Sequence, residues 1–149
     1  MRIPITKPVF GPEERKAVLQ PLVAIRRGGF EVDLVPVTSG GYVEPDAIRE
    51  RFRRDTLLVS VMHANNEIGT INPVKEIAEI CRVSNIIFHT DAVQAAAYLS
   101  VDANELGVDM LSLGAHKFYG PKGVGALYVR KGTPLLPHMT GGGQEFNLR

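Results

Sequence analysis

Apolar residues recur along this chain with two periods, one typical of strands and the other typical of helices. The strand-like segments cover residues 30–37, 56–62, 85–91, 108–114 and 125–132. The helix-like segments cover residues 12–27, 44–52, 73–81 and 92–99. Because the two kinds of segment alternate with short connections, the pattern predicts an α/β fold, with a mostly parallel sheet flanked by helices.

Two of the strand-like segments allow more specific expectations. In residues 30–37, the alternation predicts that Phe30, Val32 and Leu34 point inward. Residues 56–62 are almost continuously apolar, which is typical of a strand with both of its faces covered. Such strands belong to parallel sheets that carry helices on both sides.

The pair Asn72-Pro73 predicts the start of a helix. Asn72 is expected as the N-cap and Pro73 as the first helical residue, because an asparagine oxygen can accept from the first amides and proline needs no partner there. The expected inner stripe of this helix consists of Val74, Ile77, Ile80 and Cys81. Cys81 is therefore expected in the core.

Composition narrows the class of protein. The chain has 149 residues, 44% of them hydrophobic and 22% charged, which suits one domain with a packed core. The net charge of +1 gives no reason to expect nucleic acid or an anionic membrane as a partner. One cysteine excludes an internal disulfide, and no apolar run approaches the about 20 residues of a membrane span. We also find no signal peptide, so a cytoplasmic location is expected.

Polar side chains follow three of the predicted strands, at the point where each strand ends. They form an amide pair (Asn65, Asn66), an acid and an amide (Asp91, Gln94), and a histidine–lysine pair (His116, Lys117). Ligands of parallel α/β sheets bind beyond the carboxyl ends of the strands, so we expect these clusters to converge on one crevice.

A lysine and a carboxylate at such an edge suit pyridoxal phosphate. A lysine Schiff base holds this cofactor, and a carboxylate faces its pyridine nitrogen and keeps it protonated. The lysine amine also needs desolvation or cationic neighbours to react near neutral pH, which the end of an apolar strand provides. The sequence therefore predicts a pyridoxal phosphate site containing Asp91 and Lys117.

Four segments carry a resemblance to a known family. They are "MHANNEIG", "FHTDAVQAA", "SLGAHKFYGPKGVGALYVR" and "GGGQE". In this order, the chain resembles the cysteine desulfurases and selenocysteine lyases, class V enzymes of the aminotransferase fold, from about Lys16 to Arg149. The resemblance implies that residues 1–149 are the central part of the large cofactor domain, without the upstream phosphate-binding segment and the C-terminal small domain.

The resemblance implies a role for five residues. Lys117 would hold the cofactor and move the α-proton of the substrate, and Asp91 would pair with the pyridinium nitrogen. Gln94 would donate to the phenolic oxygen of the cofactor, and Asn66 would lie on the same side of the ring and orient the substrate. His116 would help to hold the phosphate.

The resemblance also implies a reaction and its partners. The family removes sulfur from L-cysteine, leaving alanine and a persulfide on an enzyme cysteine. The sulfur then passes to an acceptor protein in iron–sulfur cluster or thiocofactor assembly, and the enzymes are homodimers. We expect the isolated chain to be inactive alone.

Three positions differ from the family pattern. Arg15 stands where a ring-stacking histidine is usual, Gly114 replaces a serine that would meet the phosphate, and Phe146 replaces an arginine. A guanidinium can stack on a ring, but it cannot serve as a neutral acid–base group. Cys81 lies on an apolar stripe, where a reactive thiolate is unfavourable.

Other interpretations of the same residues stay open. Zinc or iron could be held by His63, His89, Asp91 and His116, as in a metal-dependent hydrolase. The chain could also be a non-catalytic scaffold fragment that pairs with another chain. Locally, Asp91 could cap the next helix, and Asn65 and Asn66 could be turn formers.

Overall fold

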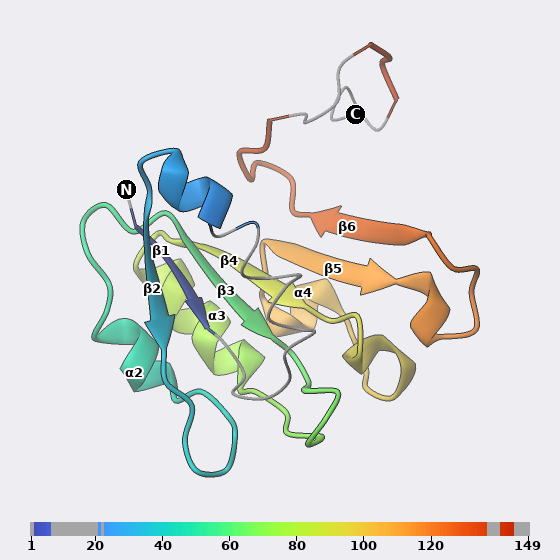
Figure 1. Ribbon diagram of the computed structural model, residues 1–149, viewed down its shortest axis with the longest axis horizontal. Coiled ribbons are helices and arrows are strands. Elements are labelled where there is room, and N and C mark those ends of the chain that lie inside the picture. Colours follow the sequence, from blue (N-terminus) through green and yellow to red (C-terminus); the bar gives the residue numbers. More distant parts are fainter. Residues whose placement is uncertain (1, 7–20, 22, 137–140, 145–149) are drawn as a thin grey trace.

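The computed structural model describes residues 2–6, 21, 23–136 and 141–144 of the chain. Figure 1 shows one six-stranded sheet with helices against it. The strands are β1 (Arg2–Thr6), β2 (Glu31–Val35), β3 (Leu58–Met62), β4 (Ile87–Asp91), β5 (Met110–Gly114) and β6 (Gly125–Val129). Their order is β2-β1-β3-β4-β5-β6, in which β6 alone runs antiparallel to its neighbour. The predicted α/β class with a mostly parallel sheet is confirmed.

The helices of the described chain are short. They are α2 (Pro45–Arg49), α3 (Val74–Val83), α4 (Ala103–Leu106) and two 3-10 helices, η1 (Ala95–Ala97) and η2 (Ala115–Lys117). Residues 23–27 are also helical, at the end of the predicted segment 12–27. The predicted helix 92–99 is reduced to η1.

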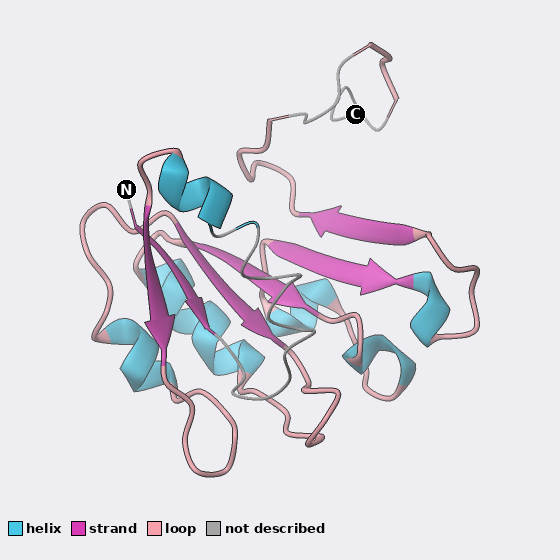
Figure 2. Ribbon diagram, viewed as in Figure 1, coloured by secondary structure: helices cyan, strands magenta, loops and turns pink. Residues whose placement is uncertain are grey.

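One hydrophobic core lies between the sheet and α3. Figure 2 shows α3 and α4 behind the strands, on one face of the sheet. Helix α3 buries Val74, Ile77, Ala78 and Cys81, so the predicted stripe is confirmed except that Ala78 is fully buried and Ile80 only partly. The sheet contributes Val59, Val61, Phe88 and Leu111 to this core.

Alternation along β3 and β4 gives the sheet two different faces. The core face carries Val61 and Phe88, each about 1% exposed. The opposite face, which we call the second face, carries the half-buried residues Leu58, Ser60, Met62, Ile87, His89, Asp91, Met110 and Ser112. The expectation that both faces of residues 56–62 are covered is therefore met only in part, because the second face is half-buried.

Strand β2 also differs from its predicted pattern. Val32 is buried with Ile25, Phe30 and Leu58 in a small second cluster, but Leu34 is 41% exposed. Val35, on the opposite face of the strand, is buried in the main core. The predicted inward position of Leu34 is wrong because, in the described chain, the cluster around Ile25 covers only the start of this edge strand.

Two elements had no predicted counterpart. Strand β1 contains Pro4, which lowers strand propensity, yet it pairs with all of β2 and at Ile5 with β3. Helix α4 begins at the N-cap Asp102, whose Oδ1 accepts from two backbone amides, and ends at Gly107 with φ 73°. Both of these helix signals are visible in the sequence.

Asn72 has a different role from the predicted one. Helix α3 begins at Val74 and has no side-chain cap. The buried Asn72 side chain instead accepts from Val43 N at 2.8 Å and donates to Met62 O at 2.7 Å. It therefore joins the loop after β2 to the end of β3, and the predicted N-cap is wrong.

We expect Asn72→Ala to lower the free energy of unfolding by about 2–3 kcal/mol, because it removes the side-chain partners of the buried Val43 amide and of the partly buried Met62 carbonyl. Urea denaturation measures the change. The matched control is Asn104→Ala on the exposed surface of α4, which should stay within about 0.5 kcal/mol. Equal effects of the two variants would contradict this role of Asn72.

Candidate functional site

The carboxyl ends of β3, β4 and β5 lie side by side at one edge of the sheet (Figure 1). Met62 is in register with Asp91, and Asp91 is in register with Ser112. Two backbone hydrogen bonds continue the pairing past the strands, from His63 N to Asp91 O (2.8 Å) and from Ala92 N to Ser112 O (3.0 Å). The edge is therefore fixed by the sheet itself.

Asp91 is the last residue of β4 and is half-buried. Its Oδ1 accepts from Val93 N at 2.9 Å, and its other carboxylate oxygen has no hydrogen bond among the described residues. The N-cap residue of η1 is Gln94, and its side chain makes no capping hydrogen bond. Asp91 therefore does not cap this helix, and its hydrogen bond to Val93 N closes a local turn. One carboxylate oxygen stays available to a ligand.

Lys117 is the last residue of η2, directly after β5, and is half-buried. The glycine loop beside it is closed by Ala115 N donating to Val124 O (3.0 Å) and Gly120 N donating to Ala115 O (2.8 Å). A Cβ on Gly120 would lie 2.9 Å from the Ala115 oxygen, so only glycine fits. The tight loop holds the backbone next to the lysine, as the glycines of this segment predict.

The other predicted site residues lie at the same edge. Gln94 is half-buried, three residues after Asp91. His116 is exposed, and its ring lies beside Gly114, where an added Cβ would be 3.3 Å from His116 Cε1. Asn66 is exposed in the turn after β3. Their individual roles stay predictions, and Arg15 and Phe146 lie outside the described residues.

Asn65 has the structural role of a turn former. It is buried, and its Oδ1 accepts from Glu67 N at 2.8 Å and from Ile68 N at 3.1 Å. The buried atoms Asn65 Nδ2 and His63 Nδ1 have no hydrogen-bond partner in the described chain. The exit of β3 therefore keeps polar atoms that the described residues do not satisfy.

A row of hydrogen bonds that sequence reasoning missed crosses three strands. Ser60 Oγ lies 2.7 Å from His89 Nδ1, and His89 Nε2 lies 2.9 Å from Ser112 Oγ. Burial lowers the pKa of His89, and the weaker effect of Asp91 opposes it. The available signal was a polar residue inside each of three apolar strands.

The metal-site alternative finds no support in the geometry. The four residues of that set all belong to the described chain, which contains no group of three histidine, cysteine or acidic side chains that could hold an ion. Both ring nitrogens of His89 already lie at hydrogen-bond distance from serines, and His116 is exposed. The expected ligands are not brought together.

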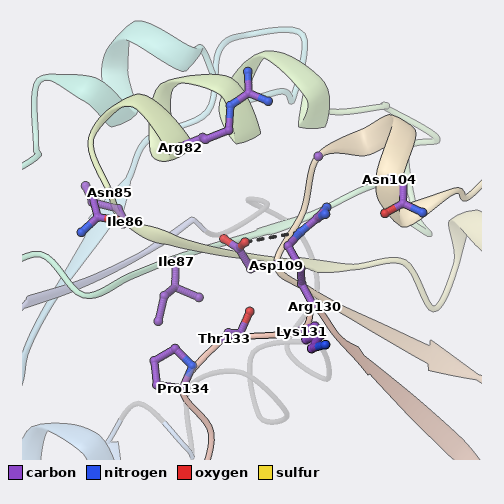
Figure 3. Close-up of a pocket in the computed structure, with 12 residues that line it drawn as sticks. Arg82, Asn85, Ile86, Ile87, Asn104, Asp109, Arg130, Lys131, Thr133 and Pro134 are labelled. Carbon is purple, nitrogen blue, oxygen red and sulfur yellow. Dashed lines mark ion pairs between the residues drawn. The ribbon is translucent and has the colours of Figure 1, made fainter.

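A separate pocket of about 470 Å³ lies at the opposite edge of the sheet (Figure 3). It is bordered by Ile87 at the start of β4 and by Asp109 and Arg130. Arg130 Nε and Asp109 Oδ1 form an ion pair at 3.6 Å. The Arg130 guanidinium also donates to the carbonyls of Val108 and Ala103. Arg130 therefore joins structural elements, away from Asp91 and Lys117.

Known proteins share this fold. A structure described as SspA in complex with cysteine superposes with a TM-score of 0.88 at 39% identity, covering 99% of this chain and 42% of that one. A NifS-like protein gives a TM-score of 0.88 at 44% identity, with 99% and 40% covered. The arrangement of strands and exits is thus that of a known class of α/β protein.

The family follows from the sequence comparison. The family described as aminotransferase class-V matches residues 6–148, and this chain belongs to it. Cysteine desulfurase IscS of Dictyoglomus turgidum is 54% identical over 136 residues, 91% of this chain and 34% of the relative. The protein of the same name from Methanosarcina thermophila is 52% identical over equal shares. The chain spans about a third of the length of these relatives. Within its described part, no helix is long and apolar enough to cross a membrane.

Cys81 is a core residue, as predicted. Its side chain is 0% exposed, and burial together with the charge of Asp109 raises the pKa of its thiol to about 12. We expect iodoacetamide to leave Cys81 unmodified in the folded chain and to modify it after unfolding in urea, because the thiolate is the reactive form. Mass spectrometry measures the modification. An added cysteine at exposed Ser100 is the control, and equal native rates at both positions would contradict the assignment.

The buried His63 and the half-buried His89 predict a loss of stability in acid. Burial lowers the pKa of His63 and His89 below their ordinary 6.5, so the unfolded chain binds more protons between the lowered values and 6.5. Their contribution is present above pH 6.5 and is lost as the pH falls below it. Urea denaturation at about pH 7.5 and about pH 5.5 should show lower stability in acid, and a smaller loss in His63→Gln. Equal stability at both pH values would contradict it.

Proposed function

We propose that this chain is the central part of the large domain of a pyridoxal phosphate-dependent cysteine desulfurase. The reaction removes sulfur from L-cysteine and leaves L-alanine and a persulfide on an enzyme cysteine. The observation that carries the proposal is the placement of Asp91 and Lys117 at neighbouring strand exits of a class V aminotransferase chain. The names of its relatives and the cysteine complex of one structural neighbour support the same substrate.

The chemistry of the donor set fits the cofactor. Asp91 is held at one oxygen by Val93 N and keeps an oxygen without a hydrogen bond among the described residues, as an acceptor for a protonated ring nitrogen requires. Lys117 is half-buried at the end of an apolar strand, and a lysine amine is the group that forms a Schiff base with this cofactor. An amide at Gln94 and an imidazole at His116 add donors for oxygen atoms.

When bound, pyridoxal phosphate supplies an electron sink for the substrate carbanion. The chain's own residues bind and orient the reactants. Asp91 would hold a proton at the ring nitrogen, and Gln94 would donate from its amide to the phenolic oxygen. Lys117 Nζ would hold the cofactor and move the α-proton of the substrate. His116 would help to hold the phosphate, and Asn66 would help to orient the substrate.

The proposal places the sulfur-carrying thiol outside these 149 residues. The one cysteine of the chain is buried, with a pKa raised to about 12, and cannot attack sulfur as a thiolate. We therefore propose that the isolated chain does not turn over cysteine. The proposed partners are L-cysteine, a sulfur-acceptor protein for iron–sulfur cluster or thiocofactor assembly, and a second subunit in a homodimer, in the cytoplasm.

Borohydride reduction in the presence of pyridoxal phosphate tests the cofactor assignment. We expect the reduced label on Lys117, because a ring nitrogen bound at Asp91 would hold the cofactor close to the neighbouring strand exit that carries this amine. Peptide mapping locates the label. Lys117→Ala should abolish the site-specific label, whereas Lys122→Ala, in the exposed part of the same loop, should keep it. Labelling spread evenly over surface lysines would favour the non-catalytic scaffold interpretation.

A further inference from the structure

The row formed by Ser60, His89 and Ser112 lies on the second face of the sheet. His89 is two residues before the end of β4. His89 and Asp91 are two residues apart on one strand and therefore point to the same face, roughly 7 Å apart along the strand. Ser112 is in register with Asp91 itself. The row thus ends directly beside the carboxylate.

Among the described residues, one charged group acts on His89. Asp91 is the charged residue that acts on the pKa of His89 within the described chain. The neighbouring strands present Ser60 and Met62 of β3 and Met110 and Ser112 of β5 to this face, and none of these side chains ionises near neutral pH. The balance between burial and the Asp91 charge favours the neutral imidazole.

Backbone pairing alone does not explain the row. Strands β3, β4 and β5 are already joined by their ladders, and apolar side chains would pack between them without the cost of desolvating polar groups. The three polar side chains on adjacent strands contact one another instead, since each imidazole nitrogen lies at hydrogen-bond distance from one hydroxyl. Such a row fixes the position of the ring, and the two hydroxyls can satisfy either neutral tautomer.

We propose that Ser60, His89 and Ser112 are positioning residues for Asp91, and that a neutral His89 clamped between two hydroxyls leaves the charge of Asp91 uncompensated for the ring nitrogen of the cofactor. This inference rests on the proposed function. An imidazolium at position 89 would neutralise the carboxylate and repel a pyridinium. An unclamped imidazole would be free to turn toward the carboxylate and compete for the oxygen that has no hydrogen bond among the described residues.

The first arm of the test needs no cofactor. In the 149-residue chain labelled with ¹⁵N histidine, NMR should show His89 as a neutral imidazole that titrates below the ordinary pKa of 6.5. Ser112→Ala should shift the ring-nitrogen signals of His89, whereas Ser100→Ala, on the exposed surface, should leave them unchanged. A His89 that is charged at neutral pH, or that does not respond to Ser112→Ala, would overturn the clamp.

The second arm measures the affinity for pyridoxal phosphate by equilibrium dialysis near pH 7.5. We expect His89→Ala to weaken binding by about tenfold and His89→Gln, a neutral side chain that can reach both serines, to restore it to within about threefold. Thermal melting of each variant identifies loss of folding. If His89→Ala does not fold, Ser60→Ala and Ser112→Ala replace it, with an expected loss of about fivefold each.

The outcomes separate the two claims. Equal losses in the Ala and Gln variants, or no loss in any row variant, would overturn the positioning role while leaving the proposed function intact. If the unmodified chain binds no pyridoxal phosphate, both the proposed function and the positioning role for the cofactor fall. The NMR result would then describe a structural clamp only.

Discussion

The parallel register of β3, β4 and β5 is the constraint on which the site depends. It aligns Met62, Asp91 and Ser112 across three strands, and backbone hydrogen bonds extend the alignment beyond the strand ends. A slip of β4 by one residue would turn Asp91 toward the core and bring Thr90 to the second face. Thr90 is fully buried and donates to Val61 O, so such a slip would also unmake a buried hydrogen bond.

The two faces of the sheet have different roles in stability and in the candidate site. On the core face, α3 packs a continuous apolar cluster against the strands and supplies the hydrophobic stabilisation. On the second face, half-buried polar residues are satisfied across strands and meet at the edge that carries Asp91 and Lys117. The apolar layer therefore supports the polar one, on which the proposed chemistry depends.

Local patterns were enough to predict the strands that carry the site. The apolar runs ending at Asp91 and near Lys117 placed both residues at strand exits, and this needs only the sequence. What local patterns cannot give is the partner of each residue. Asn72 fits the N-cap pattern, but its amide finds two buried backbone groups of distant segments. The row through His89 likewise depends on strand register. Strand β1 was not predicted because Pro4 lowers strand propensity, and its pairing with β2 cannot be seen in the sequence.

A crystal structure of the chain with bound pyridoxal phosphate tests the central claim most directly. We expect continuous electron density from Lys117 Nζ to the cofactor, with the ring nitrogen about 2.6–3.2 Å from the Asp91 carboxylate. Density for the cofactor at another place, or a ring whose nitrogen points away from Asp91, would contradict it.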